Sequence, residues 1–473
     1  MRFTDIENKK LCYLDDVENI PSKEIYIQRL EEYREFYTQS FEYLISLSSG
    51  SLASLDTSGS LASLDTSGSL ASLEHRINDA PHPLNFEIGH VVFFYDLHFL
   101  SRIMPRKLDD KIKYFDSLVN EPSMRENNPQ LSIEYQLSYM NEVFDLIKKY
   151  LNNPITNKVA YILDVCLLHN EMHKEVIYFI CQQMNTPLPG MRFTQPTLNK
   201  VENKWKRVNG GNFSQGLDKK DRLVVWDNEC PKQEMSVKSF ECQQYPVTYG
   251  EFIRFIDDNG YSREELWSIQ GWRWNQSIQN NAFHSSQLET GLRKPINLIK
   301  QNGEWYRNWF GRRIPLDYSL PVTHISYYEA EAYARWMNAR LPTETEYEYL
   351  LINGGETQWP WGNETDTSNY CNSNYQNTDI VPVGRYKQSA NKWGVEDLMG
   401  NNWTWTSTRF YPYDGFSIDP IYDTFSYPFF YDRFVVRGSS WCVDDTLFHS
   451  KYRNAQEPEK RFHFTGIRLV RDL

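Results

Sequence analysis

The feature that most constrains the fold is a change of sequence texture near residue 190. Before it, apolar residues recur at spacings of three and four over long segments nearly free of Gly and Pro, which is typical of amphipathic helices. After it, Gly, Asn, Asp and Ser interrupt the chain every few residues, and the 14 tryptophans begin only at Trp205. The 473-residue chain is therefore predicted to form two domains, over 1–190 and 191–473.

The first part is predicted to contain four long helices, at 23–47, 84–104, 131–151 and 157–183. They favour a four-helix bundle, whose core is a common place for metal sites. A Ser-rich nine-residue repeat, SLASLDTSG, occupies 51–73 and has too few copies for a solenoid. We interpret 51–73 as a flexible insertion, with a partner-binding tract as the alternative.

The second part is predicted to be an α+β domain of short strands and long ordered loops. One clear helix is expected there, from Ser326 to Asn338. Aromatic residues make up 15% of the chain, and they are expected to supply much of the core where regular structure is sparse.

Charge and cysteine usage exclude several classes of protein. The net charge of −12 argues against a nucleic-acid partner. The sequence has no apolar run of about 18 residues, which argues against a membrane span. Seven cysteines without a CxxC pair, and an N-terminus without an apolar signal core, favour a reducing compartment. We therefore predict a cytoplasmic protein.

Histidine spacing points to a metal site. His169 and His173 are four residues apart on a predicted helix, so their imidazoles share one face and can bind one ion. His90 lies on another predicted helix after a glycine, and His82 and His98 are its competitors. Three His ligands would leave open positions on a catalytic metal. The alternative is that these are ordinary core histidines.

Several strings carry a family resemblance. The strings are GHVVFFYDL, HNEMHKE, PVTYGEFIRFIDDNGY, ELWSIQGWRW, PVTHISYYEAEAYARW, RLPTETEYEYL, GVEDLMGNNWTWT, VVRGSSW and GIRLVRD. The sequence resembles the ergothioneine and ovothiol sulfoxide synthases. That family joins a DinB-like four-helix bundle to a C-type-lectin-like, formylglycine-generating-enzyme-like domain.

The resemblance implies a non-haem iron oxidoreductase. It assigns His90, His169 and His173 as Fe(II) ligands and implies oxidative C–S bond formation, with O2, between a thiol and histidine or a methylated histidine. The family also uses an active-site tyrosine as a proton or hydrogen donor. That residue is expected in the loop 409–432, where Tyr422 is favoured over Tyr413 and Tyr427, although each could instead pack in an aromatic core.

The resemblance also suggests substrate contacts. Arg125 stands where some relatives place paired arginines for a γ-glutamylcysteine carboxylate, so cysteine is an equally good thiol donor. Asn454 and Gln456 occupy a segment that lies close to the substrate in ergothioneine-type enzymes. Those enzymes have Trp-Asp where this chain has Ala455 and Gln456, so a charge that could bind an ammonium group is missing.

Three other functions compete with this interpretation. A formylglycine-generating oxidase needs two reactive cysteines, but Cys442 has no second cysteine after it. A non-catalytic binding protein would keep the fold and lose turnover. A zinc-dependent DinB-like thiol transferase would use the same three histidines, because they also suit Zn(II).

Overall fold

The computed structural model describes residues 11–16, 20–48, 84–104, 112–116, 132–193, 201–282 and 293–473. The 51–73 repeat, His82 and Arg125 lie outside these residues. The chain divides into two compact units. Unit 1 comprises Met1–Gly190 with two short later segments, Lys219–Val225 and Asp419–Asp423; unit 2 comprises Met191–Asp218, Trp226–Ile418 and Thr424–Leu473.

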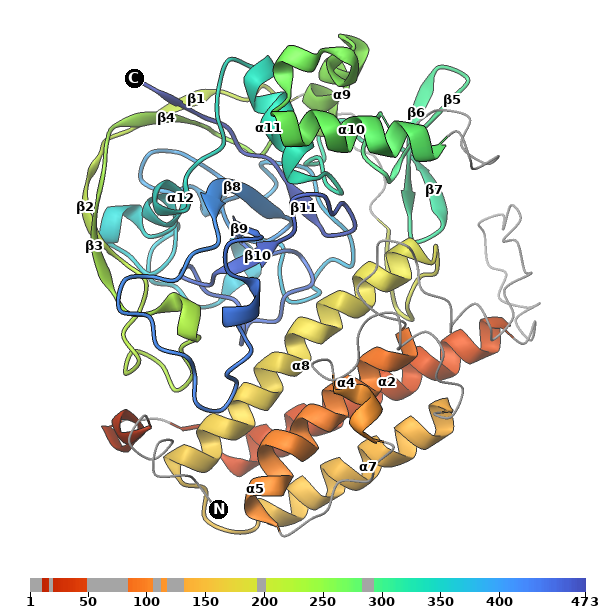
Figure 1. The fold of residues 1–473 in the computed structure, drawn as a ribbon, viewed down its shortest axis with the longest axis vertical. Coiled ribbons are helices and arrows are strands. Elements are labelled where there is room, and N and C mark those ends of the chain that lie inside the picture. Colours follow the sequence, from red (N-terminus) through yellow and green to blue (C-terminus); the bar gives the residue numbers. More distant parts are fainter. Residues whose placement is uncertain are drawn as a thin grey trace. The chain divides into compact units, whose positions relative to one another are not determined.

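Unit 1 is helical, as predicted (Figure 1). Its long helices are α2 (Lys23–Ser48), α4 (Leu84–Tyr95), α7 (Ile133–Tyr150) and α8 (Asn157–Gln183). Helix α4 continues through a π-helical turn, η2 (Asp96–Leu100), into α5 (Ser101–Ile103), and two short 3-10 turns are η1 (Cys12–Asp16) and η3 (Ile112–Phe115). Side-chain caps start α7 and α8: Ser132 accepts a bond from the Tyr135 N–H, and Thr156 from the Val159 N–H.

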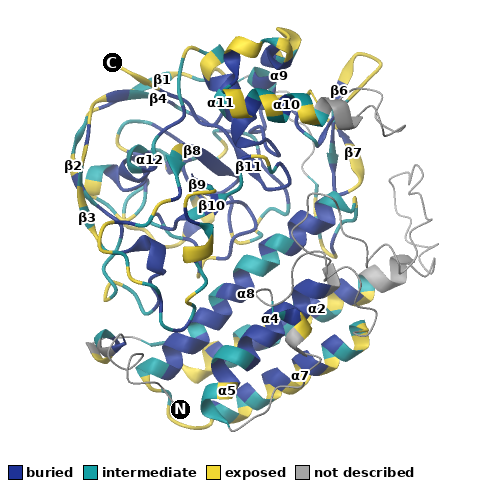
Figure 2. Ribbon diagram, in the orientation of Figure 1, coloured by how far each residue is buried: buried dark blue, intermediate teal, exposed yellow. Residues whose placement is uncertain are grey.

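The core of unit 1 lies along α4 and α8, which Figure 2 shows as mostly buried. Helix α4 contacts both α7 and α8. Its residues Ile88 and Val92 are fully buried on one side of the helix, and Phe86 and Phe93, on the opposite side, are at most 5% exposed. A helix that is apolar on most sides belongs at the centre of a helical unit. The side chains of Glu87 and His90 on α4 are therefore shielded from solvent.

Over the residues that the structure describes, unit 2 contains four small sheets. Antiparallel pairs join β1 (Trp205–Val208), β4 (Phe240–Gln243) and β12 (Val470–Asp472), in the order β1-β4-β12; β2 (Gly211–Gln215) and β3 (Gln233–Val237); and β5 (Leu298–Gln301), β6 (Glu304–Trp309) and β7 (Arg312–Pro315). The fourth sheet has the order β10 (Asn454–Gln456), β9 (Phe434–Arg437), β8 (Trp403–Arg409) and β11 (Thr465–Gly466), with β11 parallel to β8.

The expectation of a single clear helix in the second part is wrong. The predicted helix is α11 (Tyr327–Trp336), but α9 (Tyr249–Asp257), α10 (Ile269–Ala282) and α12 (Glu344–Leu351) are also present. Helices α9, α11 and α12 each begin with a capping box, in which a Ser or Thr and a Glu three residues later bond reciprocally to the backbone. These local bonds compensate for the short length of α9 and α12.

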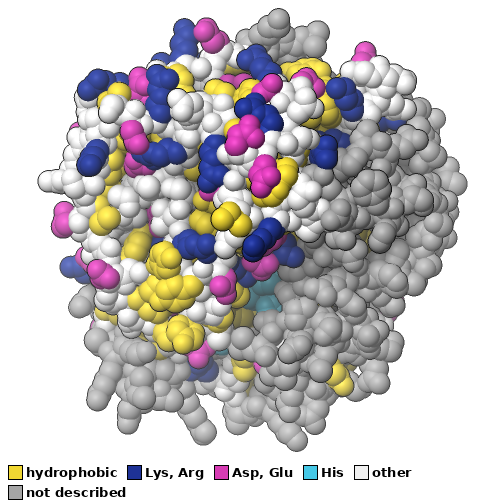
Figure 3. Space-filling view, turned by 45° about the horizontal axis from the view of Figure 1, so that its top comes forward, with side chains coloured by type: hydrophobic (Ala, Val, Ile, Leu, Met, Phe, Trp, Pro, Cys, Tyr) yellow, Lys and Arg dark blue, Asp and Glu magenta, His cyan; other side chains and the backbone are white. Residues whose placement is uncertain are grey.

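Tryptophan rings and buried side-chain ion pairs fill the core of unit 2. The tryptophans Trp309, Trp403, Trp405 and Trp441 are among its largest fully buried side chains, as expected for a domain with little regular structure. On the face shown in Figure 3, basic and acidic side chains are interspersed, with hydrophobic side chains in several groups among them. Of the helices that the structure describes, none has the length and apolar character needed to span a membrane.

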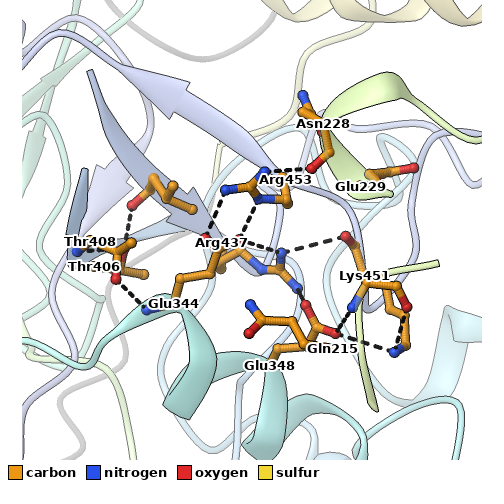
Figure 4. Close-up of polar contacts among 12 residues, drawn as sticks. Gln215, Asn228, Glu229, Glu344, Glu348, Thr406, Thr408, Arg437, Lys451 and Arg453 are labelled. Carbon is orange, nitrogen blue, oxygen red and sulfur yellow. Dashed lines mark hydrogen bonds and ion pairs between the residues drawn. The ribbon is translucent and has the colours of Figure 1, made fainter. Parts of the chain in front are cut away.

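A buried ion network ties α12 to β9 and to the chain before β10 (Figure 4). The Arg453 guanidinium contacts both oxygens of Glu344, with Nε–Oε1 at 2.6 Å and Nη2–Oε2 at 3.0 Å. Arg437 contacts Glu344 at 3.2 Å and Glu348 at 2.9 Å, and Lys451 contacts Glu348 at 3.2 Å. Because both arginines are almost fully buried, removing a carboxylate would leave a charge uncompensated.

The network predicts a loss of stability on the acid side. Burial by itself would raise the pKa of Glu344, but Arg453 and Arg437 hold it below its ordinary 4.5. A depressed folded-state pKa means that this stabilisation is full above about pH 4.5 and is lost as the pH falls through the lower folded value. We expect Glu344→Gln to lower the free energy of unfolding at pH 7 by about 3–5 kcal/mol, measured by urea denaturation.

The difference between wild type and Glu344→Gln should shrink as the pH falls below the ordinary carboxyl pKa of 4.5 and through the lower folded value. Glu265→Gln is the control, because it removes an exposed ion pair with Arg263 and should change nothing measurable at pH 7. Equal unfolding midpoints for Glu344→Gln and wild type would contradict the assignment of this network as a structural anchor.

Candidate metal centre

Three histidines of unit 1 converge on one point. His90, His169 and His173 each offer a ring nitrogen, and these atoms lie within 4.8 Å of one another. The ring centroids are 4.4 Å apart for His169 and His173, 4.8 Å for His90 and His173, and 5.2 Å for His90 and His169. The geometry is that of a three-imidazole site for one ion.

The helices place these rings. His169 and His173 follow one another on one face of α8, one turn apart, and His90 comes from the neighbouring α4. Gly89 is required beside His90, because a Cβ there would lie 2.0 Å from Cε1 of Phe115. The missing side chain lets η3 press against α4 and brings the Phe115 backbone to His90.

Two of the three imidazoles are oriented by a second partner. The Nδ1 atom of His173 lies 2.5 Å from Oε2 of Glu87, and the Nδ1 atom of His90 lies 2.8 Å from the Phe115 carbonyl oxygen. Such bonds fix the tautomer and direct the other nitrogen, Nε2, to a metal. Sequence reasoning missed Glu87, although a lone carboxylate in the apolar α4 stretch, three residues before His90, is a usable signal.

His169 supplies the test of whether this site fits a metal. It is fully buried, and neither of its ring nitrogens has a hydrogen-bond partner. Burial, and then the neighbouring His173 and His90, hold its pKa well below 6.5, so the ring is neutral and able to coordinate. A metal ion would pair with a ring nitrogen of His169, whose burial without a partner costs free energy. Three imidazole ligands suit Fe(II), and they suit Zn(II) as well.

The three candidate tyrosines lie in different settings. Tyr422 belongs to unit 1, with its ring centroid 5.5 Å from that of His169 and 4.8 Å from that of Phe94. Tyr413 belongs to unit 2, where its hydroxyl contacts Glu344 at 3.3 Å. Tyr427 is 65% exposed in unit 2. Tyr422 is therefore the one of the three that is placed against a histidine of the cluster.

The remaining candidates are placed as follows. His98 lies on η2, where its ring centroid is 4.2 Å from that of Phe94, and it is not part of the three-histidine cluster. Burial lowers its pKa to about 4. Asn454 and Gln456 are half-buried on β10, the edge strand of its sheet in unit 2. Arg125 and His82 lie outside the described residues.

Comparison with known proteins identifies the C-terminal part. Residues 194–473 match the family described as sulfatase-modifying factor enzyme 1-like domain. The chain belongs to this family. The match starts before β1 and covers every strand of unit 2, which confirms the expected formylglycine-generating-enzyme-like domain and the recognised resemblance.

Individual relatives carry several names. The chain is 37% identical over 266 residues to hercynine oxygenase of Mycobacterium tuberculosis, covering 55% of this chain and 59% of that protein. It is 28% identical to formylglycine-generating enzyme of the same organism, over 45% of this chain and 75% of that one. It is 30% identical to inactive C-alpha-formylglycine-generating enzyme 2 of Mus musculus, over 49% and 72%. The chain thus spans about 60% of the matched hercynine oxygenase.

Removing two cluster histidines should abolish metal binding. We expect His169→Ala/His173→Ala to lose stoichiometric Fe(II), because a single remaining imidazole is too weak a site. Metal analysis of anaerobically reconstituted protein measures this. His98→Asn is the control and should keep the metal, because His98 lies outside the cluster. Full iron occupancy in the double variant would contradict the three-histidine site.

Glu87 should tune the affinity of the site. Glu87→Gln removes the charge that orients His173, so the metal dissociation constant is expected to rise about 10–100-fold. Competition with a chromophoric chelator measures it. Asp96→Asn is the matched control. Asp96 is equally buried, on the turn η2 that continues α4, but it accepts a bond from the Tyr139 hydroxyl instead. If both variants lost metal affinity equally, Glu87 would act through the fold and not specifically through His173.

Proposed function

We propose that the protein is an Fe(II)- and O2-dependent sulfoxide synthase, joining a cysteine-type thiol to histidine or a methylated histidine. The observation that carries this proposal is the three-histidine cluster of unit 1, with Tyr422 against it. Family membership supports it, since relatives named hercynine oxygenase imply an oxygenase acting on a histidine derivative.

The reaction balances without a further reductant. A thiol RSH, an imidazole ring C–H and O2 give the sulfoxide RS(O)–C and one water. The new C–S bond and the oxidation of sulfur each release two electrons, and these four electrons reduce O2. Fe(II), when bound, supplies open coordination positions and redox chemistry; a thiolate is a soft ligand suited to it.

The protein's own groups have separate roles in this proposal. His90, His169 and His173 hold the metal, and Glu87 and the Phe115 carbonyl orient two of the rings. Tyr422 provides a hydroxyl that can deliver a proton or hydrogen at the reacting centre. We further propose Arg125, Asn454 and Gln456 as substrate contacts, and cysteine or γ-glutamylcysteine as the thiol.

Two less direct proposals accompany this function. Four long helices and a metal-binding histidine pair favour a DinB-like origin for unit 1. The cytoplasm is the proposed compartment, because an Fe(II) enzyme with a thiol substrate suits a reducing environment. The cysteines Cys166, Cys181, Cys242 and Cys371 are free and buried, and Cys230 and Cys442 are also buried.

The direct test is a matrix of substrates. Protein purified without oxygen and loaded with Fe(II) is mixed with O2, cysteine or γ-glutamylcysteine, and histidine at each methylation state. We expect oxygen uptake and one product whose mass equals thiol plus imidazole plus O minus 2 H. Zinc-loaded protein is the control and should consume no oxygen. Thiol transfer with zinc, or no uptake with any pair, would overturn the proposal.

The tyrosine assignment gives a second test. Tyr422→Phe is expected to lower kcat by about 10²–10⁴-fold while iron occupancy stays stoichiometric, because only the hydroxyl is removed. Tyr427→Phe, in an exposed side chain, should keep full kcat. Tyr413→Phe should act on unfolding, since its hydroxyl contacts Glu344. Full kcat in Tyr422→Phe would remove this residue from the mechanism.

A further inference from the structure

The segment that carries Tyr422 is bonded to the helix that carries two of the histidines. Asp419–Asp423 belongs to unit 1 although it lies far along the chain from the helices. The hydroxyl of Tyr161, on α8, donates a hydrogen bond to Oδ2 of Asp419. Tyr161 precedes His169 by eight residues, which is about 12 Å of helix. Helix α8 therefore connects this hydrogen bond to the three-histidine cluster.

The second oxygen of the same carboxylate holds the backbone of the segment. Oδ1 of Asp419 accepts the N–H of Ile421 at 2.8 Å and the N–H of Tyr422 at 3.0 Å. One side chain therefore bonds to α8 through one oxygen and to the backbone of Tyr422 through the other. Because the Asp419 side chain is only 4% exposed, water competes little for these bonds.

Neighbouring groups hold the same segment. Lys219 Nζ lies 3.7 Å from Oδ2 of Asp419 and donates to the Val225 carbonyl at 2.9 Å, so the other short segment of unit 1 also contacts this carboxylate. The ring centroid of His98, on η2, lies 6.2 Å from that of Tyr422. The segment thus packs against rings of α4 and η2 and is bonded to α8.

We propose that Asp419 is a positioning residue that, through Tyr161, holds the Tyr422 hydroxyl at the metal centre. This inference rests on the proposed function for its catalytic consequence. A loop side chain held to within about 1 Å keeps its reactive group in place, whereas a small displacement costs a large factor in rate. If Asp419 had only a structural role, it would stabilise unit 1 without acting through Tyr422.

The first experiment needs neither metal nor activity. Hydrogen–deuterium exchange of metal-free protein reports on the amides of Ile421 and Tyr422. We expect Asp419→Ala to speed their exchange about tenfold, because both lose their acceptor, and Tyr161→Phe about fivefold, because one link is lost. Asp419→Asn keeps an acceptor oxygen and should fall between wild type and Asp419→Ala.

Tyr139→Phe is the matched control for Tyr161→Phe. Tyr139 also donates to a buried carboxylate in unit 1, at 2.8 Å from Oδ2 of Asp96, but that carboxylate lies on η2. The control should leave the amides at 421 and 422 at the wild-type rate. Thermal unfolding of both variants shows whether their folds are equally intact.

The second experiment is a double-mutant cycle on kcat. Asp419→Asn alone should lower kcat about tenfold, with iron occupancy unchanged and KM for the imidazole substrate within about twofold of wild type. In the Tyr422→Phe background, Asp419→Asn should lower kcat no further, because it acts through a hydroxyl that is already absent. If Asp419 had only a structural role, the kcat losses of the two single variants would multiply in the double variant.

The outcomes separate the two proposals. Unchanged exchange at 421 and 422 in Asp419→Ala, or multiplied losses in the cycle, would overturn the positioning role and leave the proposed function standing. A wild type that is inactive with every thiol–imidazole pair would overturn the proposed function. The exchange experiment would still decide, in that case, whether Asp419 holds the segment to α8.

Discussion

The packing of α4 against α8 buries an imidazole that has no hydrogen-bond partner. His169 is fully buried, and both of its ring nitrogens are unpaired. An unsatisfied polar group in such a place costs about 1–3 kcal/mol, which folding by itself does not recover. Phe94 stacks on the ring at 3.7 Å and excludes water from that side. A metal ion bound at the cluster would offset this cost, and the oriented rings of His90 and His173 would reduce the entropy lost on coordination.

The parts of this site that follow local rules could be predicted from sequence. Helix α8 begins at Asn157 and ends at Gln183, as predicted, because its apolar spacing, Thr156 cap and following Pro-Gly run agree. The pairing of His169 and His173 follows from helix geometry alone. The partners of these rings do not. Glu87 meets His173 across 86 residues, and η3 meets His90 only because Gly89 lacks a side chain.

The second part shows a different limit. Helices α9 and α12 are nine and eight residues long, too short for a clear 3.6-residue period, yet their Thr-x-x-Glu starts are visible in the sequence. Their capping boxes were the stronger signal. Glu344 illustrates why charge alone misleads, because in sequence it resembles a solvated residue of the first helical turn. The Glu344 carboxylate can be buried because Arg437 and Arg453 contact it in the folded chain and compensate its charge.

The resemblance favours Tyr422 over Tyr413 and Tyr427, but the loop's own spacing cannot separate the three, because its aromatic residues are too closely spaced to show a period. What separates them is the partner of each neighbouring carboxylate. Glu344, beside Tyr413, is neutralised by two arginines, which makes that tyrosine part of an ion network. Asp419, beside Tyr422, is instead bonded by Tyr161 on the histidine-bearing helix. Burial raises the pKa of Tyr161 well above its ordinary value, so its hydroxyl remains a donor to that carboxylate at any physiological pH.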